Sequence, residues 1–354
     1  MNDAVTIKEI ARIAGVSIGT VDRVLHNRGR VADSTRRKIQ QILKETGYKG
    51  NVFASALSRA AVLKIGIILP RLEQNEGFWG VVKQGMDAAL DAYSQFRLQA
   101  HYYYFDRYKP ETILPAFAQF SQTENNALLL TAIHPQTMEQ LVRKLSPEIP
   151  LICTNADLEN SNRTTYVGQD SFASGITAGR MMELLVPGSG NFAVITVQPR
   201  DYHINQRAAG FKAYFQSRGD VSITSYHLPD AEEFTAFDKL CTQILEESKQ
   251  LNGLFVPNCS VHFFAAAMRE HLKRDDVKII GYDLIRQNAE LLARGWIDFL
   301  INQQPYQQGY LSVQTAFRAT MLKEATPEKI LLPIEIIAKE NLQSFQEPAT
   351  GQAF

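Results

Sequence analysis

The chain begins with a stretch, Thr6-Ile-Lys-Glu-Ile-Ala-Arg-Ile-Ala-Gly-Val-Ser-Ile-Gly-Thr-Val-Asp-Arg-Val-Leu-His26, that predicts two short helices joined by a tight turn. Thr6 and Glu9 have the S/T-x-x-E spacing of a capping box, which marks the start of the first helix. Gly15 can adopt the positive φ that the turn requires, and Ser17 is a favoured N-cap for the second helix. Apolar residues recur at helical spacing, at Ile7, Ile10, Ala11 and Ala14. This arrangement is typical of a DNA-binding helix-turn-helix.

A third helix is predicted to begin at Asp33 or Ser34 and to end at Gly47. Its apolar positions, together with those of the second helix, would close a small core: Val21, Val24, Leu25, Ile39, Ile42 and Leu43. Residues 1–49 are therefore predicted to form an all-α, three-helix domain.

Charge is distributed unevenly along the chain. The 354 residues include 37 basic and 37 acidic side chains, so the formal net charge is zero. Residues 1–60, however, hold eleven Lys or Arg and five Asp or Glu, a net charge of +6, and the remainder carries −6. A basic module on an acidic body is expected where contact with DNA phosphates is confined to one end of a protein.

Three cysteines, Cys153, Cys241 and Cys259, are too few and too widely spaced for a disulfide framework or a zinc site. We predict buried thiols, no metal and no cofactor. The N-terminus has no long apolar run, and no stretch approaches the 18 apolar residues of a membrane span. The expected location is the cytoplasm, in association with the nucleoid and without membrane contact.

From Lys64 onward, apolar strand-like runs alternate with amphipathic helical stretches. The predicted strands are 65–69, 98–105, 127–133, 150–153, 192–197, 221–226, 254–256 and 277–282. The predicted helices are 79–94, 111–123, 136–145, 171–186, 204–218, 233–249, 260–273, 285–294 and 307–323. Such alternation favours α/β units with parallel sheets, and its length favours two similar lobes, each a doubly wound parallel sheet. Ligands of these sheets bind beyond the carboxyl ends of the strands.

Enzyme motifs are missing from these units. The first predicted strand is followed by Pro-Arg-Leu-Glu-Gln74, which is neither a G-x-G-x-x-G turn nor a phosphate loop. There is no G-x-S-x-G and no H-E-x-x-H. We therefore expect a binding protein and no enzyme. A transport-binding protein would share the lobes, but the predicted headpiece and the missing signal peptide argue against it.

The helix-turn-helix, continued by Asn27-Arg-Gly-Arg-Val-Ala-Asp-Ser-Thr-Arg36 and Gly47-Tyr48, resembles the LacI/GalR family of bacterial repressors. The resemblance covers the whole chain and implies a type I periplasmic-binding-protein-like sensor. The implied divisions are a headpiece (1–49), a hinge segment (50–62), a sensor (63–345) and a tail (346–354). Within the sensor, the first lobe would comprise 63–164 and 297–329, and the second lobe 165–296 and 330–345.

In this family the second helix enters the major groove of DNA. Ile18 and Gly19 match the two positions that usually select bases, and Arg23 lies one turn further on. Because Ile18 can contact only a thymine methyl and Gly19 has no side chain, Arg23 is the expected base reader. Asp22 either assists Arg23 and the bases or pairs with a neighbouring base such as Arg12. Positions that contact the DNA backbone are matched by Thr6, Ser17, Thr20, His26 and Arg30.

The hinge segment matches a helix that, in the family, folds on operator DNA and inserts a leucine into the minor groove. Leu57 has that position, and Asn51 and Ala54 have matching ones. The family commonly has Pro where this chain has Gly50, so we expect its hinge to lose more entropy on ordering.

Eight residues of the sensor match the family's ligand-binding positions: Phe78, Trp79, Asn155, Asp170, Arg207, Asn258, Asp283 and Gln303. Phe78 and Trp79 would stack on a sugar ring or serve as core residues, and Asp170 would bind ligand or cap the helix that begins at Ser171. Arg207 would fork onto ligand hydroxyls. A polar, aromatic-flanked set of balanced charge fits a neutral sugar or a related polyol.

The resemblance therefore implies a homodimeric, sequence-specific transcriptional regulator, expected to be a repressor. It would bind palindromic operator DNA, and a small carbohydrate between the sensor lobes would control its affinity. The alternatives are a non-sugar effector and a sensor that has lost ligand binding.

Overall fold

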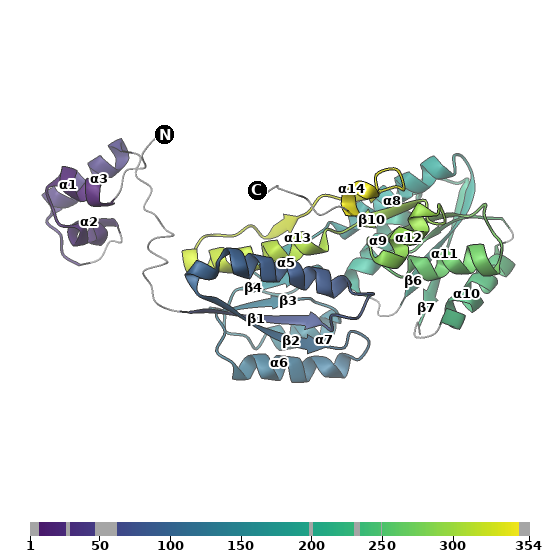
Figure 1. Cartoon of the computed structure of the whole chain (residues 1–354), viewed down its shortest axis with the longest axis horizontal. Helices are drawn as coiled ribbons and strands as arrows, with labels where there is room; N and C mark the ends of the chain where they lie inside the picture. The colour runs from purple at the N-terminus through teal and green to yellow at the C-terminus, as the bar shows by residue number, and fades with distance from the viewer. Residues whose placement is uncertain are drawn as a thin grey trace. The chain divides into compact units, whose positions relative to one another are not determined.

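A computed structural model of the chain describes residues 7–25, 29–46, 62–197, 201–229, 234–248 and 250–346 (Figure 1). The chain divides into two compact units, residues 1–61 and residues 62–354. Of the predicted DNA-contacting residues, Thr6, His26, Asn51, Ala54 and Leu57 lie outside the described ranges.

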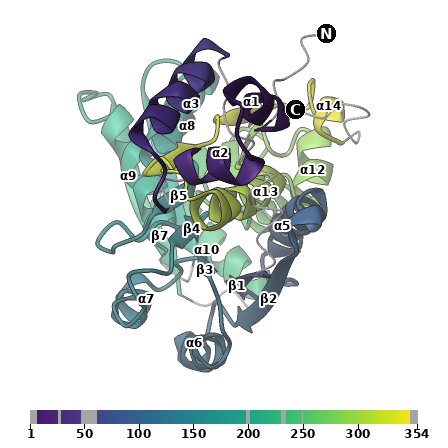
Figure 2. The ribbon, with the colours of Figure 1, turned by 90° about the vertical axis from the view of Figure 1, so that its left-hand side faces the viewer.

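The described residues of the first unit, 7–25 and 29–46, form three helices around one core (Figure 2). They are α1 (Ile7–Ala14), α2 (Ile18–Leu25) and α3 (Asp33–Glu45). Gly15 has a φ of 68° in the turn between α1 and α2, and the Ser17 hydroxyl accepts a hydrogen bond from the Thr20 amide at 3.2 Å. The buried residues are Ile10, Ala11, Ala14, Val21, Val24, Ile39 and Ile42. The turn, the N-cap and the core confirm the predicted helix-turn-helix.

The second unit consists of two lobes, each built on a six-stranded sheet. In spatial order the first sheet contains β11 (Lys329–Leu331), β5 (Thr165–Gly168), β4 (Leu151–Thr154), β3 (Ala127–Leu130), β1 (Leu63–Pro70) and β2 (Leu98–Phe105). All its strands are parallel. Its helices are α5 (Phe78–Ala92), α6 (Ile113–Gln122), α7 (Pro135–Val142) and α13 (Pro305–Phe317). In Figure 1, α5 and α13 run along one face of the sheet and α6 lies on the other.

The second sheet contains β12 (Glu335–Ile337), β10 (Phe299–Asn302), β9 (Lys278–Tyr282), β8 (Leu251–Phe255), β6 (Gly190–Val197) and β7 (Val221–Leu228). Among the described strands of this sheet, β12 alone is antiparallel to its neighbour. The helices of this lobe are α8 (Ser171–Leu185), α9 (Tyr202–Tyr214), α10 (Phe234–Glu247), α11 (Val261–Ala266), α12 (Arg286–Ala293) and α14 (Gln343–Gln346). A separate apolar core covers each face of this sheet. The predicted pair of doubly wound α/β lobes is thus confirmed.

The chain crosses between the lobes three times, and two of the crossings differ clearly from their predicted places. Strand β5 belongs to the first sheet, so the first crossing falls at 169–170 instead of 164–165. Strand β10 belongs to the second sheet, so the return falls at 303–304 instead of 296–297. The third crossing, at 332–334, follows β11. These strands are three or four residues long and include or adjoin polar residues, so they lack the continuous apolar run that marks β3 and β4.

Close helix packing fixes the backbone on both sides of the crossings. Gly175 on α8 contacts the backbone of Arg207 on α9, and Gly85 on α5 contacts the backbone of Tyr306 on α13. A methyl group at either glycine would overlap the carbonyl group that faces it. These contacts hold the Arg207 backbone, and the chain next to Gln303, against rigid helices.

Candidate functional site

Four of the eight predicted ligand residues form one hydrogen-bonded network between the lobes, with Gln303 at its centre. The Gln303 side-chain oxygen accepts hydrogen bonds from Asn155 at 3.1 Å and from the Arg207 guanidinium. The Gln303 amide nitrogen donates to Asp283 Oδ1 at 2.6 Å. All four side chains are buried. Since Gln303 lies on a crossing, Asn155 in the first lobe, and Arg207 and Asp283 in the second, the network joins both lobes to the chain between them.

Arg207 is the largest charged side chain of the network, and only 1% of its surface is exposed. Its guanidinium lies 4.2 Å from the centre of the Tyr282 ring, and it donates to the Pro257 carbonyl at 3.0 Å. These contacts fix the plane of the guanidinium. Its Nε–H has no hydrogen-bond partner within the described ranges.

Two members of the network have left-handed backbone conformations that direct them out of their strands. Asn155 (φ 68°) directly follows β4, and Asp283 (φ 71°) directly follows β9. Asn and Asp tolerate this region better than other non-glycine residues, and unusual backbone angles concentrate at functional sites. The turn at each strand end therefore presents a polar side chain to the space between the lobes.

The other predicted ligand residues have more local contacts. The Phe78 and Trp79 rings are both buried and meet edge to face, 5.0 Å apart. Asn258 is buried and accepts a hydrogen bond from the Ser260 amide at 3.2 Å. Asp170 is exposed and accepts from the Ala173 amide at 2.9 Å, which makes it the N-cap of α8. Helix capping, one of the two roles predicted for Asp170, is thus observed.

The structure also contains a buried ion pair between the lobes that the sequence did not predict. Arg107 follows β2 and donates to Asp201, just before α9, at 2.8 Å. A second guanidinium nitrogen of Arg107 donates to Asn75. The position of Arg107 in the sequence could have marked it as a candidate site residue, because Asp106 and Arg107 come directly after the predicted strand 98–105.

Burial dominates the electrostatics of the site. It raises the pKa of Asp283 to about 6, although Arg207 and the hydrogen bond from Gln303 oppose the shift. Burial also raises the pKa of Asp201, against the pull of Arg107. The pKa of His203 is lowered well below its usual value by burial and by the two nearby guanidinium groups. His203 is therefore neutral at physiological pH.

The raised pKa of Asp283 predicts a specific pH dependence of stability. Between the ordinary pKa of 3.8 and about 6, the folded chain holds a proton that the unfolded chain releases. The contribution of Asp283 to stability therefore falls as pH rises through this window, by about 3 kcal/mol in total. Urea unfolding across this range should show the fall in the wild type and lose it in Asp283→Asn. Identical pH profiles for the two proteins would contradict this assignment.

Several buried polar atoms in this region lack a protein partner within the described ranges. They include Arg107 Nε, Asp201 Oδ1, His203 Nδ1 and Arg207 Nε. Because most buried polar groups in proteins are hydrogen-bonded, such a group of unpaired donors and acceptors indicates a site that can take up a polar molecule.

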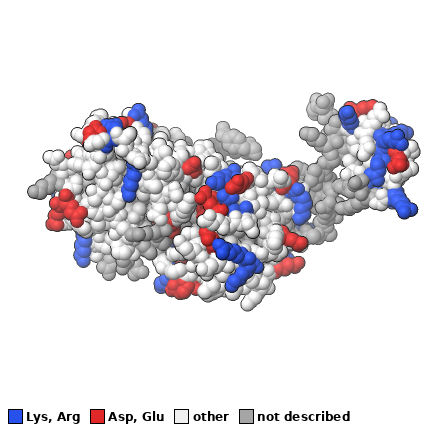
Figure 3. Space-filling model, turned by 180° about the vertical axis from the view of Figure 1, so that it is seen from behind, with Lys and Arg blue, Asp and Glu red and all other residues white. Residues whose placement is uncertain are grey.

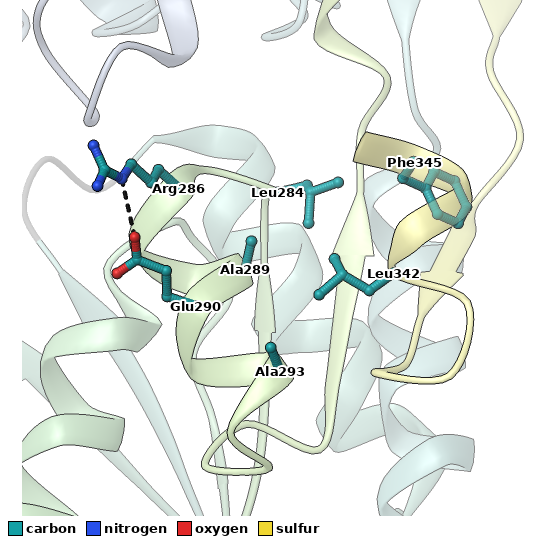
Figure 4. A pocket seen from close by; sticks show the side chains of 7 residues that line it. All are labelled: Leu284, Arg286, Ala289, Glu290, Ala293, Leu342 and Phe345. Atoms are coloured by element: carbon teal, nitrogen blue, oxygen red, sulfur yellow. Dashed lines mark hydrogen bonds and ion pairs between the residues drawn. The ribbon is translucent and has the colours of Figure 1, made fainter. Parts of the chain in front are cut away.

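Cavities lie beside the network. One of about 480 Å³ is lined by Phe78 and Asp283 and by the starts of α5, α12 and α13. A smaller one of about 150 Å³ is lined by Gln169, Asp170 and His203. A third hollow, of about 550 Å³, lies on the second lobe between α12 and α14 (Figure 4). It is lined by none of the eight predicted ligand residues, and its charged pair, Arg286 and Glu290, is exposed.

The described ranges contain no group of three or more His, Cys, Asp or Glu side chains arranged to hold a metal ion. The three cysteines are free and buried, and burial raises the pKa of each thiol. Among the same residues, no helix has the length and apolar character of a membrane span.

The predicted recognition helix α2 exposes one side and buries the other. Val21 and Val24 pack in the core, while Ile18, Gly19 and Arg23 are exposed. Thr20 is partly exposed beside Ser17, and Arg30 is exposed after the helix. Lys and Arg side chains gather on the face of the first unit seen in Figure 3. Of the predicted DNA-contacting residues that the structure describes, Ile18, Gly19 and Arg23 therefore lie on the exposed side of α2, the helix predicted to enter the major groove.

A helix-turn-helix unit joined to a two-lobed binding unit defines a class, the ligand-controlled DNA-binding proteins. Residues 6–51 match the family described as bacterial regulatory proteins, lacI family, and residues 65–324 match the periplasmic binding protein domain. The chain belongs to the lacI family of transcriptional regulators.

Two transcriptional regulators are similar to the chain in sequence, and one solved structure is similar to it in fold. The chain is 31% identical to the HTH-type transcriptional regulator GalS of Salmonella typhimurium over 79% of its own length and 80% of the relative. It is 22% identical to the ribose operon repressor of Lactococcus lactis, over 96% and 98% of the two chains. Its fold is similar to that of GanP, a glucose-galactose binding protein from Geobacillus stearothermophilus, with a TM-score of 0.70, 18% identity, and coverage of 80% and 99%.

Proposed function

We propose that this DNA-binding regulator is a repressor whose operator affinity is controlled by a small polyhydroxylated effector bound between the sensor lobes. The observation that carries the proposal is the Gln303-centred network, which joins both lobes and one crossing through hydrogen bonds. An effector that replaced some of these hydrogen bonds with bonds to itself would change the free-energy difference between the open and closed lobes. It would therefore favour one arrangement of the lobes.

The chemistry of the site favours a neutral sugar or a polyol. Arg107 and Arg207 are balanced in number by Asp201 and Asp283, so the site offers donors and acceptors without a large net charge. The unpaired atoms include guanidinium N–H donors and a carboxylate acceptor, which suit hydroxyl groups because a hydroxyl both donates and accepts. The aromatic side chain of Phe78 lines the cavity next to the network.

Operator recognition is assigned to α2, with Arg23 as the base reader and Ser17, Thr20 and Arg30 toward the DNA backbone. We further propose a homodimer, since a helix-turn-helix dimer reads two half-sites of a palindrome about one helical turn apart. An operator titration with a stoichiometry of one chain per palindrome would contradict the dimer while leaving the effector site unaffected.

A thermal-shift screen of the full chain tests the effector. The Lactococcus relative is named for a ribose operon and GanP for glucose and galactose, so these sugars begin the screen, followed by polyols and sugar acids. We expect a neutral polyhydroxylated compound to raise the melting temperature of the wild type and to have little effect on Arg207→Lys. Stabilisation only by compounds without hydroxyl groups, or by none of the panel, would contradict the proposed effector class.

A further inference from the structure

The ion pair between Arg107 and Asp201 lies at the mouth of the space between the lobes. The three crossings leave from β5, β10 and β11, at one end of the two sheets. Arg107 follows β2, the edge strand at the opposite end of the first sheet. Asp201 follows β6, which lies next to the corresponding edge strand of the second sheet. The pair therefore closes the side that the crossings leave unconnected.

Burial and hydrogen bonding make this pair unlike the surface ion pairs of the chain. Arg107 is 3% exposed and Asp201 is 1% exposed. The Arg107 backbone is held as well: its amide donates to the Gln74 side chain at 3.0 Å, and its carbonyl is 2.7 Å from His134 Nε2. Exposed ion pairs contribute little, whereas removing one member of a buried pair leaves an uncompensated charge.

A turn with unusual backbone angles adds two further contacts at the same mouth. Asn75, Glu76 and Gly77 have consecutive positive φ values of 54°, 52° and 83°. Asn75 accepts from Arg107 and donates to Cys259 Sγ, in the second lobe, at 3.3 Å. Glu76 accepts from Gln287, also in the second lobe, at 2.8 Å. Non-glycine residues in this region cost free energy, so the surrounding contacts must hold the turn in place.

We propose that Arg107 and Asp201, supported by Asn75, form a latch that holds the lobes closed without an effector. Separating the lobes breaks the pair without unfolding either sheet, because each residue belongs to a different lobe. A contact within the chain, and not a bound effector, then keeps the ligand-free sensor closed. If the proposed effector function is correct, the effector shifts the lobes only by its difference in affinity for the latched and unlatched states.

Distances between labels on the two lobes of the ligand-free, full-length chain test the latch. Glu111 follows β2 and Ser225 lies on β7, the edge strands farthest from the crossings, and both residues are exposed. The native cysteines are buried. Spin labels can therefore be attached selectively through Glu111→Cys and Ser225→Cys. The latch is removed by Asp201→Asn, and also by the paired change Arg107→Ala with Asp201→Ala, which leaves neither a buried charge nor a side-chain contact between the two positions if the single variant folds poorly.

A matched control removes a different contact between the lobes. Glu159 accepts a hydrogen bond from Tyr202 at 2.9 Å at an exposed position, so Glu159→Ala, which removes the acceptor, should leave the distances unchanged. We expect one short distance in the wild type, with the open state below about 10%, and a major longer distance in both latch variants. A wild-type distribution that is already dominated by the long distance would overturn the latch. A folded variant with alanine at both Arg107 and Asp201 that stays as closed as the wild type would do the same.

Discussion

Replacing Arg207 with alanine is expected to abolish the effector response and to destabilise the sensor. The guanidinium donates to Gln303 and to the Pro257 carbonyl and lies over the Tyr282 ring. Hydrogen bonds to charged groups contribute about 1.5–3 kcal/mol each, so each bond that the proposed effector loses with the guanidinium should weaken binding about 10-fold or more. Removing the cation also leaves Asp283 buried without its nearest positive charge, which should lower the unfolding free energy by about 3–5 kcal/mol.

Two measurements separate the effects of Arg207→Ala. Urea unfolding reports the loss of stability, and calorimetric titration with the compound identified in the screen reports the loss of binding. Arg180→Ala is the matched control, because Arg180 is an exposed arginine on α8 that pairs with Glu183 on the same helix. It should leave effector binding unchanged. A folded Arg207→Ala protein that binds the effector like the wild type would remove Arg207 from the site and favour binding elsewhere in the sensor.

Replacing Arg23 with alanine is expected to reduce operator affinity and sequence discrimination together. Arg23 is exposed on α2, while Ile18 and Gly19 offer no side-chain hydrogen bonds to bases. A bidentate contact between arginine and guanine contributes about 1–3 kcal/mol of discrimination, so the operator should lose about 10- to 100-fold in affinity. Binding to unrelated DNA should change much less, which compresses the ratio between specific and non-specific affinity.

Arg30→Ala provides the comparison for Arg23→Ala. Arg30 is assigned to the DNA backbone, so its loss should weaken binding to all sequences by a similar factor and lower the salt dependence. Fluorescence anisotropy with the operator and with a scrambled duplex measures both variants. If Arg23→Ala lowers the two affinities equally, Arg23 contacts phosphate, and base selection falls to other groups.

The elements with a clear apolar pattern could be predicted from the sequence, and short strands that contain polar residues could not. Strand 98–105 has the predicted bounds, and the helix predicted at 171–186 is observed at Ser171–Leu185. Strands β5 and β10 were not predicted, because Thr165 and Gly168 in β5 and Asn302 in β10 interrupt the apolar run that a strand of this length needs to be recognised. Since those strands decide where the chain crosses, the lobe boundaries were displaced with them.

The site was partly predictable for a similar reason. Asn155 and Asp283 follow strands, where parallel sheets place their binding residues, and Gln303 and Arg207 come from the family resemblance. The ion pair between Arg107 and Asp201 joins residues 94 positions apart in different lobes. Only the path of the three crossings brings those two side chains together, and no local pattern records that path.

Coupling between effector and operator is the central claim, and one thermodynamic cycle tests it directly. Operator affinity of the full chain is measured with and without saturating effector, and effector affinity with and without operator. The account predicts that both ratios differ from one, typically by about 5- to 150-fold, and that they are equal. A compound that binds the wild type through Arg207 and yet leaves operator affinity unchanged would contradict the account.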